Sequence, residues 1–143
     1  MKPTLLIADG DAELCDLYQR YITGRGYEVE TASDGLECVA KLRQATPAAM
    51  LLDLELRWGG GDGVLAWLRE DRAAPQVPVI LMATTGCSLD VAKVIKPPVV
   101  QVLPKPFTLT ALLMSVRSAV ARNARAQPFY GDRASVRLEL FVG

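Results

Sequence analysis

The sequence predicts an α/β fold in which a five-stranded parallel sheet is doubly wound, with five helices on its two faces. Two observations lead to this prediction. Short apolar runs bounded by turn residues recur along the chain, and such runs are typical of strands buried on both faces of a sheet. Between them lie segments with apolar residues at helical spacing. Strands that alternate with helices of this length imply βαβ units with right-handed crossovers.

The first half of the chain is expected to hold three strands and two helices. Residues 4–8 form a buried strand, and residues 27–31 alternate like an edge strand with one face in water. The helix between them has apolar residues at i, i+3, i+4 and i+7: Leu14, Leu17, Tyr18 and Tyr21. A second helix opens at residues 34–35. The apolar run 48–52 is the third strand, and it ends on Asp53.

The second half is expected to complete the sheet with a helix, a strand, a short helix, a strand and a long helix. Their expected ranges are 64–71, 79–84, 89–95, 99–103 and 109–120. Residues 1–126 therefore form one domain, and residues 127–143 are a C-terminal tail. That tail has high β propensity in part, and three alternatives stay open for it: an added strand, an interaction segment or a disordered end.

The composition excludes several classes of function. The 16 basic and 16 acidic residues cancel, so no overall field attracts nucleic acid or an anionic membrane surface. No apolar run approaches the roughly 18 residues of a transmembrane helix, and no signal peptide is evident, so we expect a cytoplasmic location. Because the chain has no histidine, it has no His-dependent triad and no histidyl phosphate donor of its own. The cysteines (Cys15, Cys38 and Cys87) are too widely spaced for a zinc motif.

Polar side chains stand at the carboxyl ends of four predicted strands. In chain order they are Asp9 and Asp11, Asp53, Thr84, and Lys105. The carboxyl ends of parallel strands emerge at one edge of a sheet, where ligands gather, so we expect these side chains to meet. A glycine-rich loop, residues 59–63, follows Asp53; its spacing fits no nucleotide-binding motif, and we expect a flexible loop.

The chemistry of these residues points to phosphoryl transfer. Carboxylates that converge without histidine suit Mg²⁺, and the candidate ligands are Asp9, Asp11, Asp53 and Glu55. The Lys105 ammonium and the Thr84 hydroxyl can interact with an incoming phosphoryl group. An aspartate can itself be the nucleophile and form an acyl phosphate. The residues therefore predict metal-assisted phosphorylation of Asp53.

On these motifs the sequence resembles the receiver domain of two-component response regulators, which has a flavodoxin-like fold. The resemblance covers residues 4–123, and its most telling motif is Lys105-Pro106-Phe107 after the fifth strand. It implies that Asp53 is the phosphoacceptor, that Asp9 belongs to the metal site, and that Thr84 and Lys105 contact the phosphoryl group. It also implies a cis peptide between Lys105 and Pro106.

The same resemblance implies the partners and the kind of output. A sensor histidine kinase or phosphotransfer protein would supply the phosphoryl group, and a downstream protein partner or a homodimer would receive the signal. It implies a signalling module that is not an enzyme. From the balanced charge alone, we expect no contact with nucleic acid or membrane.

The sequence also departs from the family pattern. Gly10 stands where the family has a second metal-binding acid, and Val102 stands where an aromatic residue is common. Arg57 replaces a common proline in a loop that is two residues longer than usual. Because the affinity for a hard cation follows the number of charged ligands, Gly10 should weaken or abolish Mg²⁺ binding. Either Asp11 takes over as a ligand or the domain works with little phosphorylation.

Three questions stay open at this level. A pseudo-receiver, which keeps the fold and acts as an interaction module without phosphorylation, is the main alternative. A phosphatase of the haloacid-dehalogenase type is a further one, because residues 9–11 read Asp-Gly-Asp and Asp9 would be its nucleophile. Finally, alignment from Pro78 puts Ala83 rather than Thr84 at the position of the switch hydroxyl.

Overall fold

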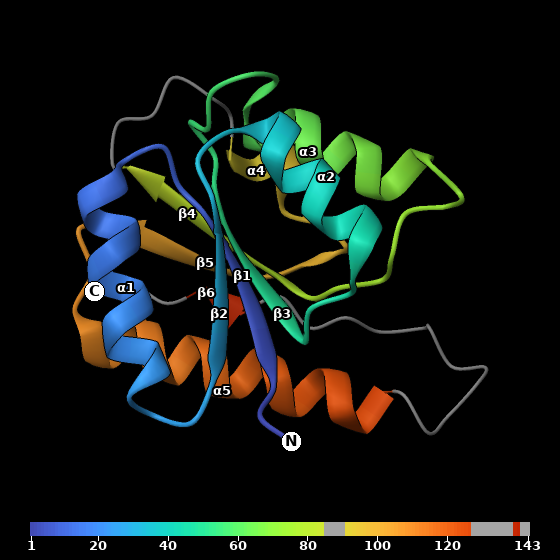
Figure 1. The fold of residues 1–143 in the computed structure, drawn as a ribbon. Coiled ribbons are helices and arrows are strands. Elements are labelled where there is room, and N and C mark those ends of the chain that lie inside the picture. The colour runs from blue at the N-terminus through green and yellow to red at the C-terminus, as the bar shows by residue number, and fades with distance from the viewer. Residues whose placement is uncertain (85–90, 127–138, 141–143) are drawn as a thin grey trace.

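A computed structural model describes residues 1–84, 91–126 and 139–140 of the chain (Figure 1). Strands and helices alternate from the N-terminus to residue 126. The elements are β1 (Thr4–Ala8), α1 (Ala12–Thr23), β2 (Glu28–Ala32), α2 (Gly35–Gln44), β3 (Ala49–Asp53), α3 (Gly60–Glu70), β4 (Val79–Thr84), α4 (Val91–Val94), β5 (Val99–Lys105), α5 (Leu109–Ala126) and β6 (Glu139–Leu140).

All strand pairs of the sheet are parallel, and the strand order is β2-β1-β3-β4-β5-β6. The predicted five-stranded parallel sheet is therefore confirmed, with one short strand added at its edge. The winding reverses at β1, which lies between β2 and β3, and the ends of β1 and β3 are neighbours in the register Ala8↔Leu52. In open sheets of this kind, ligands bind at such a switch point.

Helices cover both faces of the sheet (Figure 1). Side chains such as Leu6, Leu52 and Leu81 point to one face, where they form a core with α2 and α3. Their neighbours Ile7 and Leu51 point to the other face, where α1 and α5 cover them. Every residue of β3 is buried, which is why this strand reads as a continuous apolar run.

Polar caps set the starts of three helices. The Asp11 carboxylate accepts hydrogen bonds from the backbone N–H groups of the first turn of α1. Asp34 does the same for α2, where Glu37 reaches back to the Ser33 N–H. The Thr108 hydroxyl accepts from the Ala111 N–H at the start of α5.

Several predicted boundaries were wrong. The helix α3 begins at Gly60, so most of the segment 59–63 is its first turn and not a flexible loop. The helix α4 is a single turn, which leaves four helices of ten or more residues in the part of the chain that the structure describes. The predicted start of that short helix, at residue 89, lies outside the described residues. Of the tail 127–143, the structure describes residues 139–140, which pair with β5.

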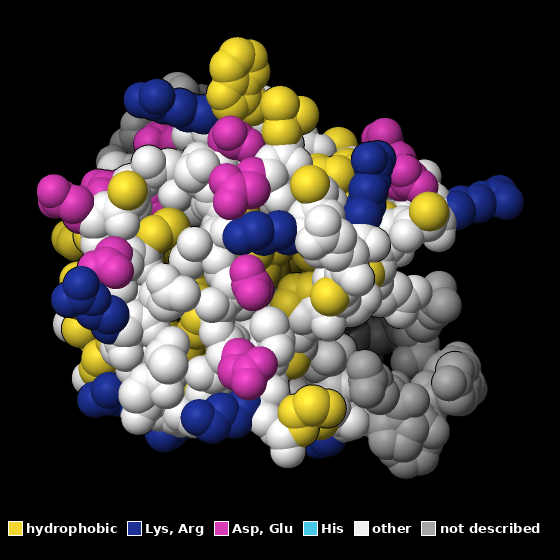
Figure 2. Space-filling model, in the orientation of Figure 1, with side chains coloured by type: hydrophobic (Ala, Val, Ile, Leu, Met, Phe, Trp, Pro, Cys, Tyr) yellow, Lys and Arg dark blue, Asp and Glu magenta, His cyan; other side chains and the backbone are white. Residues whose placement is uncertain are grey.

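The charges of the surface are mixed. On the face that Figure 2 shows, acidic and basic side chains alternate without a large patch of one sign. No helix in the described ranges is long and apolar enough to cross a membrane.

The two cysteines in the described part of the chain are unpaired and buried. Burial raises the pKa of the Cys15 thiol to about 11 and that of the Cys38 thiol to about 12. Both thiols are therefore inert at neutral pH. Cys87 lies outside the described residues.

Candidate functional site

The ends of β1, β3 and β5 bring three of the predicted side chains together. The Lys105 Nζ lies 2.7 Å from Asp9 Oδ2 and 3.4 Å from Asp53 Oδ2. Both carboxylates are buried, with Asp9 only 2% and Asp53 8% exposed. The peptide bond after this lysine, Lys105–Pro106, is cis, which confirms that expectation; Pro97–Pro98 is cis as well.

Backbone hydrogen bonds fix the other oxygen of each carboxylate. The Asp11 N–H donates to Asp9 Oδ1 at 2.9 Å, and the Glu55 N–H donates to Asp53 Oδ1 at 3.0 Å. Each carboxylate is thus held at one oxygen by the chain that follows it and faces Lys105 with the other. This arrangement orients Asp53 before any ligand binds.

For both Asp53 and Lys105, burial and the neighbouring charges of opposite sign shift the pKa in opposite directions. Burial raises the pKa of the Asp53 carboxyl, although the Glu55 N–H and the Lys105 charge partly offset it. Burial alone would lower the pKa of the Lys105 ammonium. Its hydrogen bond to Asp9 and the charge of Asp53 outweigh burial, so this pKa lies above its usual value. Lys105 therefore stays cationic at neutral pH and is a permanent counter-charge for Asp53.

A cavity of about 390 Å³ lies over these residues. Its lining consists of Asp9, Gly10, Asp11, Leu14, Asp53, Glu55, Arg57 and Lys105. The volume falls in the range of small-ligand pockets, and the polar groups converge in it. The cavity can therefore admit a group as small as a phosphoryl group beside Asp53.

Two predicted residues are placed differently from this group. Thr84 is the last residue of β4, is exposed, and pairs with Lys105 in the strand register, but it is not part of the cavity lining. Its neighbour Ala83 is buried and has no hydroxyl. Asp11 does line the cavity, but its Oδ1 accepts from the Glu13 and Leu14 N–H groups as the cap of α1.

Sequence reasoning missed Arg57 as a site residue. We had noted it only as a replacement for a common proline, yet it lines the cavity. The available signal was its position four residues after Asp53, in the loop that leaves β3. Trp58, the next residue, is 70% exposed.

The fold and the site define a signalling receiver of the kind that the sequence resembles. The family model of the response regulator receiver domain matches residues 5–117, and the chain belongs to this family. Receiver domains are generally signalling modules that interact with histidine kinases.

Several named proteins are similar to the chain. It is 31% identical over 123 residues to the DNA-binding dual master transcriptional regulator RpaA of Synechocystis sp., with 86% of this chain and 51% of that protein covered. It is 28% identical over 123 residues to the DNA-binding response regulator MtrA of Mycobacterium leprae, with 86% of this chain and 53% of that protein covered. The chain spans about half the length of these curated relatives.

Solved receiver structures have the same fold. A CheY-like response regulator receiver domain protein from Methanospirillum hungatei superposes with a TM-score of 0.78 at 22% identity, over 87% of this chain and 98% of that one. The receiver domain of the Francisella response regulator 1452 gives a TM-score of 0.76 at 21% identity, over 85% of this chain and 98% of that one.

Receiver domains typically bind Mg²⁺ in their acidic site, but the acids described here do not fit that ion well. In residues 1–84, 91–126 and 139–140, no group of three or more Asp, Glu or Cys side chains could hold a metal ion. Gly10 offers no carboxylate, Asp11 caps a helix, and the Lys105 ammonium already contacts both Asp9 and Asp53. The ligand set Asp9, Asp11, Asp53 and Glu55 stays a prediction that this arrangement does not favour.

Proposed function

We propose that Asp53 accepts a phosphoryl group from the phosphohistidine of a sensor histidine kinase or a phosphotransfer protein. The observation that carries the proposal is the placement of Asp53. Its carboxylate lies at the end of β3 in the cavity, with Oδ1 held by the Glu55 N–H and Oδ2 3.4 Å from the Lys105 ammonium.

The transfer needs an ionised carboxylate and a nearby positive charge. An Asp53 oxygen attacks phosphorus, the bond from phosphorus to the donor nitrogen breaks, and the imidazole leaves with that electron pair. The Lys105 ammonium stabilises the negative charge on the phosphoryl oxygens, while its 2.7 Å contact with Asp9 holds it in place. Since burial raises the pKa of Asp53, the rate should fall with acidity at a higher pH than for an exposed aspartate.

The output of the domain is proposed to be a change in protein contacts in the cytoplasm. A downstream protein partner, or a second copy in a homodimer, would recognise the phosphorylated form. We propose no contact with nucleic acid or membrane, because the 16 acidic and 16 basic residues leave no net charge for either. The relatives named as DNA-binding extend well beyond the matched region, so their activity is not carried over.

Labelling with acetyl phosphate tests the proposal. The full chain and the Asp53→Asn variant are incubated with acetyl phosphate, and intact mass is recorded. Wild type should gain one phosphoryl group and Asp53→Asn none. Asp16→Asn is the matched control, since Asp16 forms an exposed ion pair with Arg20 on α1. If wild type gains no label under any condition, the proposed function is wrong.

A phosphorylation-independent interaction module is the second candidate. It is favoured by Thr84, which lies outside the cavity lining and leaves the switch hydroxyl without an assigned residue. This candidate expects wild type and Asp53→Asn to bind a partner equally, with or without acetyl phosphate. A phosphatase that uses Asp9 is disfavoured, because the Asp9 side chain is less exposed than that of Asp53, 2% against 12%, and its contact with Lys105 is shorter, 2.7 against 3.4 Å.

A further inference from the structure

Arg57 is the one cation of the cavity lining that has no partner among the residues that the structure describes. The other cation, Lys105, is shared between Asp9 and Asp53. The Arg57 side chain is exposed, and its guanidinium makes neither a hydrogen bond nor an ion pair to the described part of the chain. It therefore lies at the cavity with none of its five N–H donors bonded to a residue that the structure describes.

The backbone that carries Arg57 is held firmly. The Gly35 N–H donates to the Arg57 carbonyl at 2.8 Å, which ties the loop to the start of α2. Trp58 has a φ of 59°, a left-handed conformation that is strained for a bulky residue. Its ring is 70% exposed, so burial of the ring does not offset this strain. Such outliers cluster at functional sites, and this one fixes the direction in which the chain leaves Arg57.

The charges of the cavity make a further cation necessary once Asp53 is phosphorylated. The lining holds four carboxylates, those of Asp9, Asp11, Asp53 and Glu55, against the two cations. A phosphoryl group brings a charge of about −1.5 to −2 to one of these carboxylates. The described acids form no group that could bind a divalent ion, and Lys105 already forms ion pairs with two carboxylates. Arg57 is the remaining source of positive charge.

We propose that Arg57 takes the place of the divalent metal, so that its guanidinium binds the phosphoryl oxygens on Asp53 and the site accepts a phosphoryl group without Mg²⁺. This inference rests on the proposed function of Asp53. The planar fork of a guanidinium matches two phosphate oxygens at once, and arginine stays charged at any working pH. With acetyl phosphate, an Asp53 oxygen bonds to phosphorus, the bond from phosphorus to the acetate oxygen breaks, and acetate leaves with the electron pair.

The experiment measures the rate of phosphorylation with and without divalent cations. The full chain is incubated with acetyl phosphate either in EDTA or in Mg²⁺, and the label is followed by intact mass. The variants are Arg57→Ala, Arg57→Lys and, as a matched control, Arg72→Ala, an exposed arginine after α3. Because no described side-chain contact is lost at Arg57, thermal unfolding should be unchanged in all variants, which separates a charge effect from misfolding.

Wild type should be labelled in EDTA at a rate similar to that in Mg²⁺. Arg57→Ala should slow labelling in EDTA by about 10-fold or more, as expected for the loss of a charged donor to the transition state. The labelling rate of Arg57→Lys in EDTA should lie between those of wild type and Arg57→Ala, and the rate of Arg72→Ala should match that of wild type. Labelling of wild type only in Mg²⁺, or equal labelling of Arg57→Ala and wild type in EDTA, overturns this inference and leaves the function of Asp53 intact. Absence of label in wild type under both conditions overturns both.

Discussion

Lys105 has unequal contacts with its two carboxylates. Both carboxylates line the cavity, but Asp9 lies 2.7 Å from the ammonium and Asp53 lies 3.4 Å away. The closer contact anchors the lysine on Asp9, and the longer contact leaves the Asp53 oxygen more accessible. In the proposed phosphorylation, Asp9 would hold the Lys105 ammonium in place while its charge faces the reacting Asp53 oxygen.

The substitution Asp53→Asn should raise the free energy of unfolding, relative to wild type, by more at pH 7 than at pH 4. Burial raises the pKa of the folded-state carboxyl above its usual 3.8, so the native state holds this proton more tightly than the unfolded state. The resulting stabilisation is complete below pH 3.8 and is lost as the pH rises through the higher folded-state pKa. Asparagine does not titrate. The free energy of unfolding of the variant minus that of wild type should therefore increase with pH in urea unfolding; a difference that is constant or decreasing would contradict this.

The connection from β3 to α3 is the element that shapes the site. The first turn of α3 lies directly on the end of β3, because a Cβ built on Gly61 would stand 2.5 Å from the Asp53 carbonyl oxygen and 2.7 Å from the Leu54 Cα. The Gly61 N–H also donates to the Leu54 carbonyl. This close contact holds the loop that contains both Glu55 and Arg57 at the rim of the cavity.

Two glycines of this turn give a matched pair of variants. Gly61→Ala should lower the free energy of unfolding by at least about 1 kcal/mol, since its Cβ meets backbone atoms that cannot move aside. Gly63→Ala should raise it by about 0.5–1 kcal/mol, because nothing lies within 4 Å of its Cβ and alanine is the better helix former. Urea unfolding of both variants gives the comparison. Equal effects of the two substitutions would show that the close contact at Gly61 is not structurally important.

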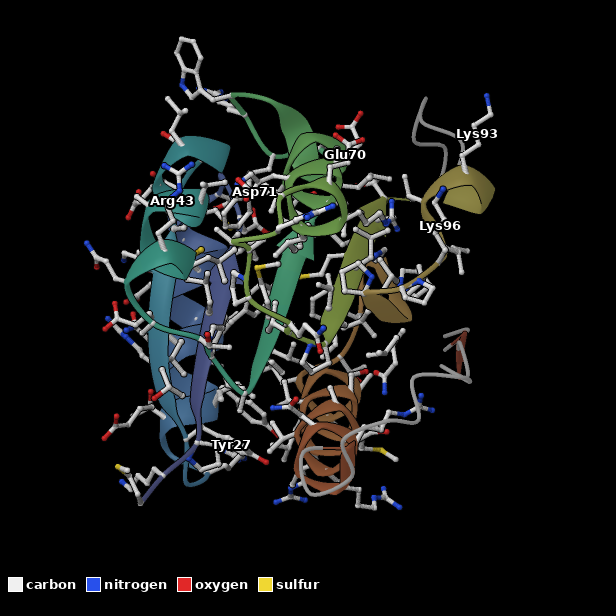
Figure 3. The ribbon with its side chains drawn as sticks, turned by 90° about the vertical axis from the view of Figure 1, so that its right-hand side faces the viewer. Tyr27, Arg43, Glu70, Asp71, Lys93 and Lys96 are labelled. Atoms are coloured by element: carbon white, nitrogen blue, oxygen red, sulfur yellow. The ribbon has the colours of Figure 1, made fainter. Side chains whose placement is uncertain are left out.

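The C-terminal half of α3 holds the segment between α4 and β5 through Arg69. Its guanidinium donates to the carbonyls of Val94, Lys96 and Pro97 at 2.8, 2.9 and 2.9 Å. In Figure 3, α2 with Arg43 and α4 with Lys93 lie on either side of α3, which ends at Glu70. Lys96 lies in the segment that follows α4. The central helix of this face is therefore also the one that fixes the position of α4.

Arg69→Ala should lower the free energy of unfolding by about 1–2 kcal/mol, because three carbonyls lose a charged donor and solvent compensates only in part. Arg72→Ala, which removes an exposed arginine three residues later, should change it by less than about 0.5 kcal/mol. Chemical denaturation distinguishes the two. A loss at Arg72 as large as that at Arg69 would mean that overall charge, and not the carbonyl contacts, sets the effect.

For the whole molecule, the order of strands and helices could be predicted because burial requires apolar residues at a characteristic spacing in each element. A strand such as β3, which is buried along its whole length, is apolar up to the Asp53 at its end, and the helices have one apolar and one polar face. The start of α3 was missed because Gly60 and Gly61 read as loop residues. Their helical state depends on contacts with the end of β3, which no local pattern reveals. The strand β6 was left open, since two residues carry no periodicity.

The site residues that stand at strand ends could be predicted, because the strands themselves could be predicted. Asp9, Asp53 and Lys105 meet because parallel strands end at one edge, and this follows from strand order alone. For Arg57 the sequence offers only its position in the loop that leaves β3, because the contact that holds this loop beside α2 joins residues far apart in the chain. The sequence predicts Asp11 as a metal ligand, whereas the structure places it as the cap of α1, a role that suits its position directly before the helix.

The boundary between the domain and the tail stays a prediction, and it can be tested at the scale of the molecule. Both described cores are built from residues between Leu5 and Val120, while β6 contributes two residues that pair with Gln101 and Val102. A chain of residues 1–126 should therefore unfold cooperatively, within about 1–2 kcal/mol of the full chain, since the described part of the tail contributes only the pairing of residues 139–140 with β5. Urea unfolding followed by circular dichroism measures both chains. If residues 1–126 aggregate or unfold without a cooperative transition, the tail is part of the domain, and the division at residue 126 is wrong.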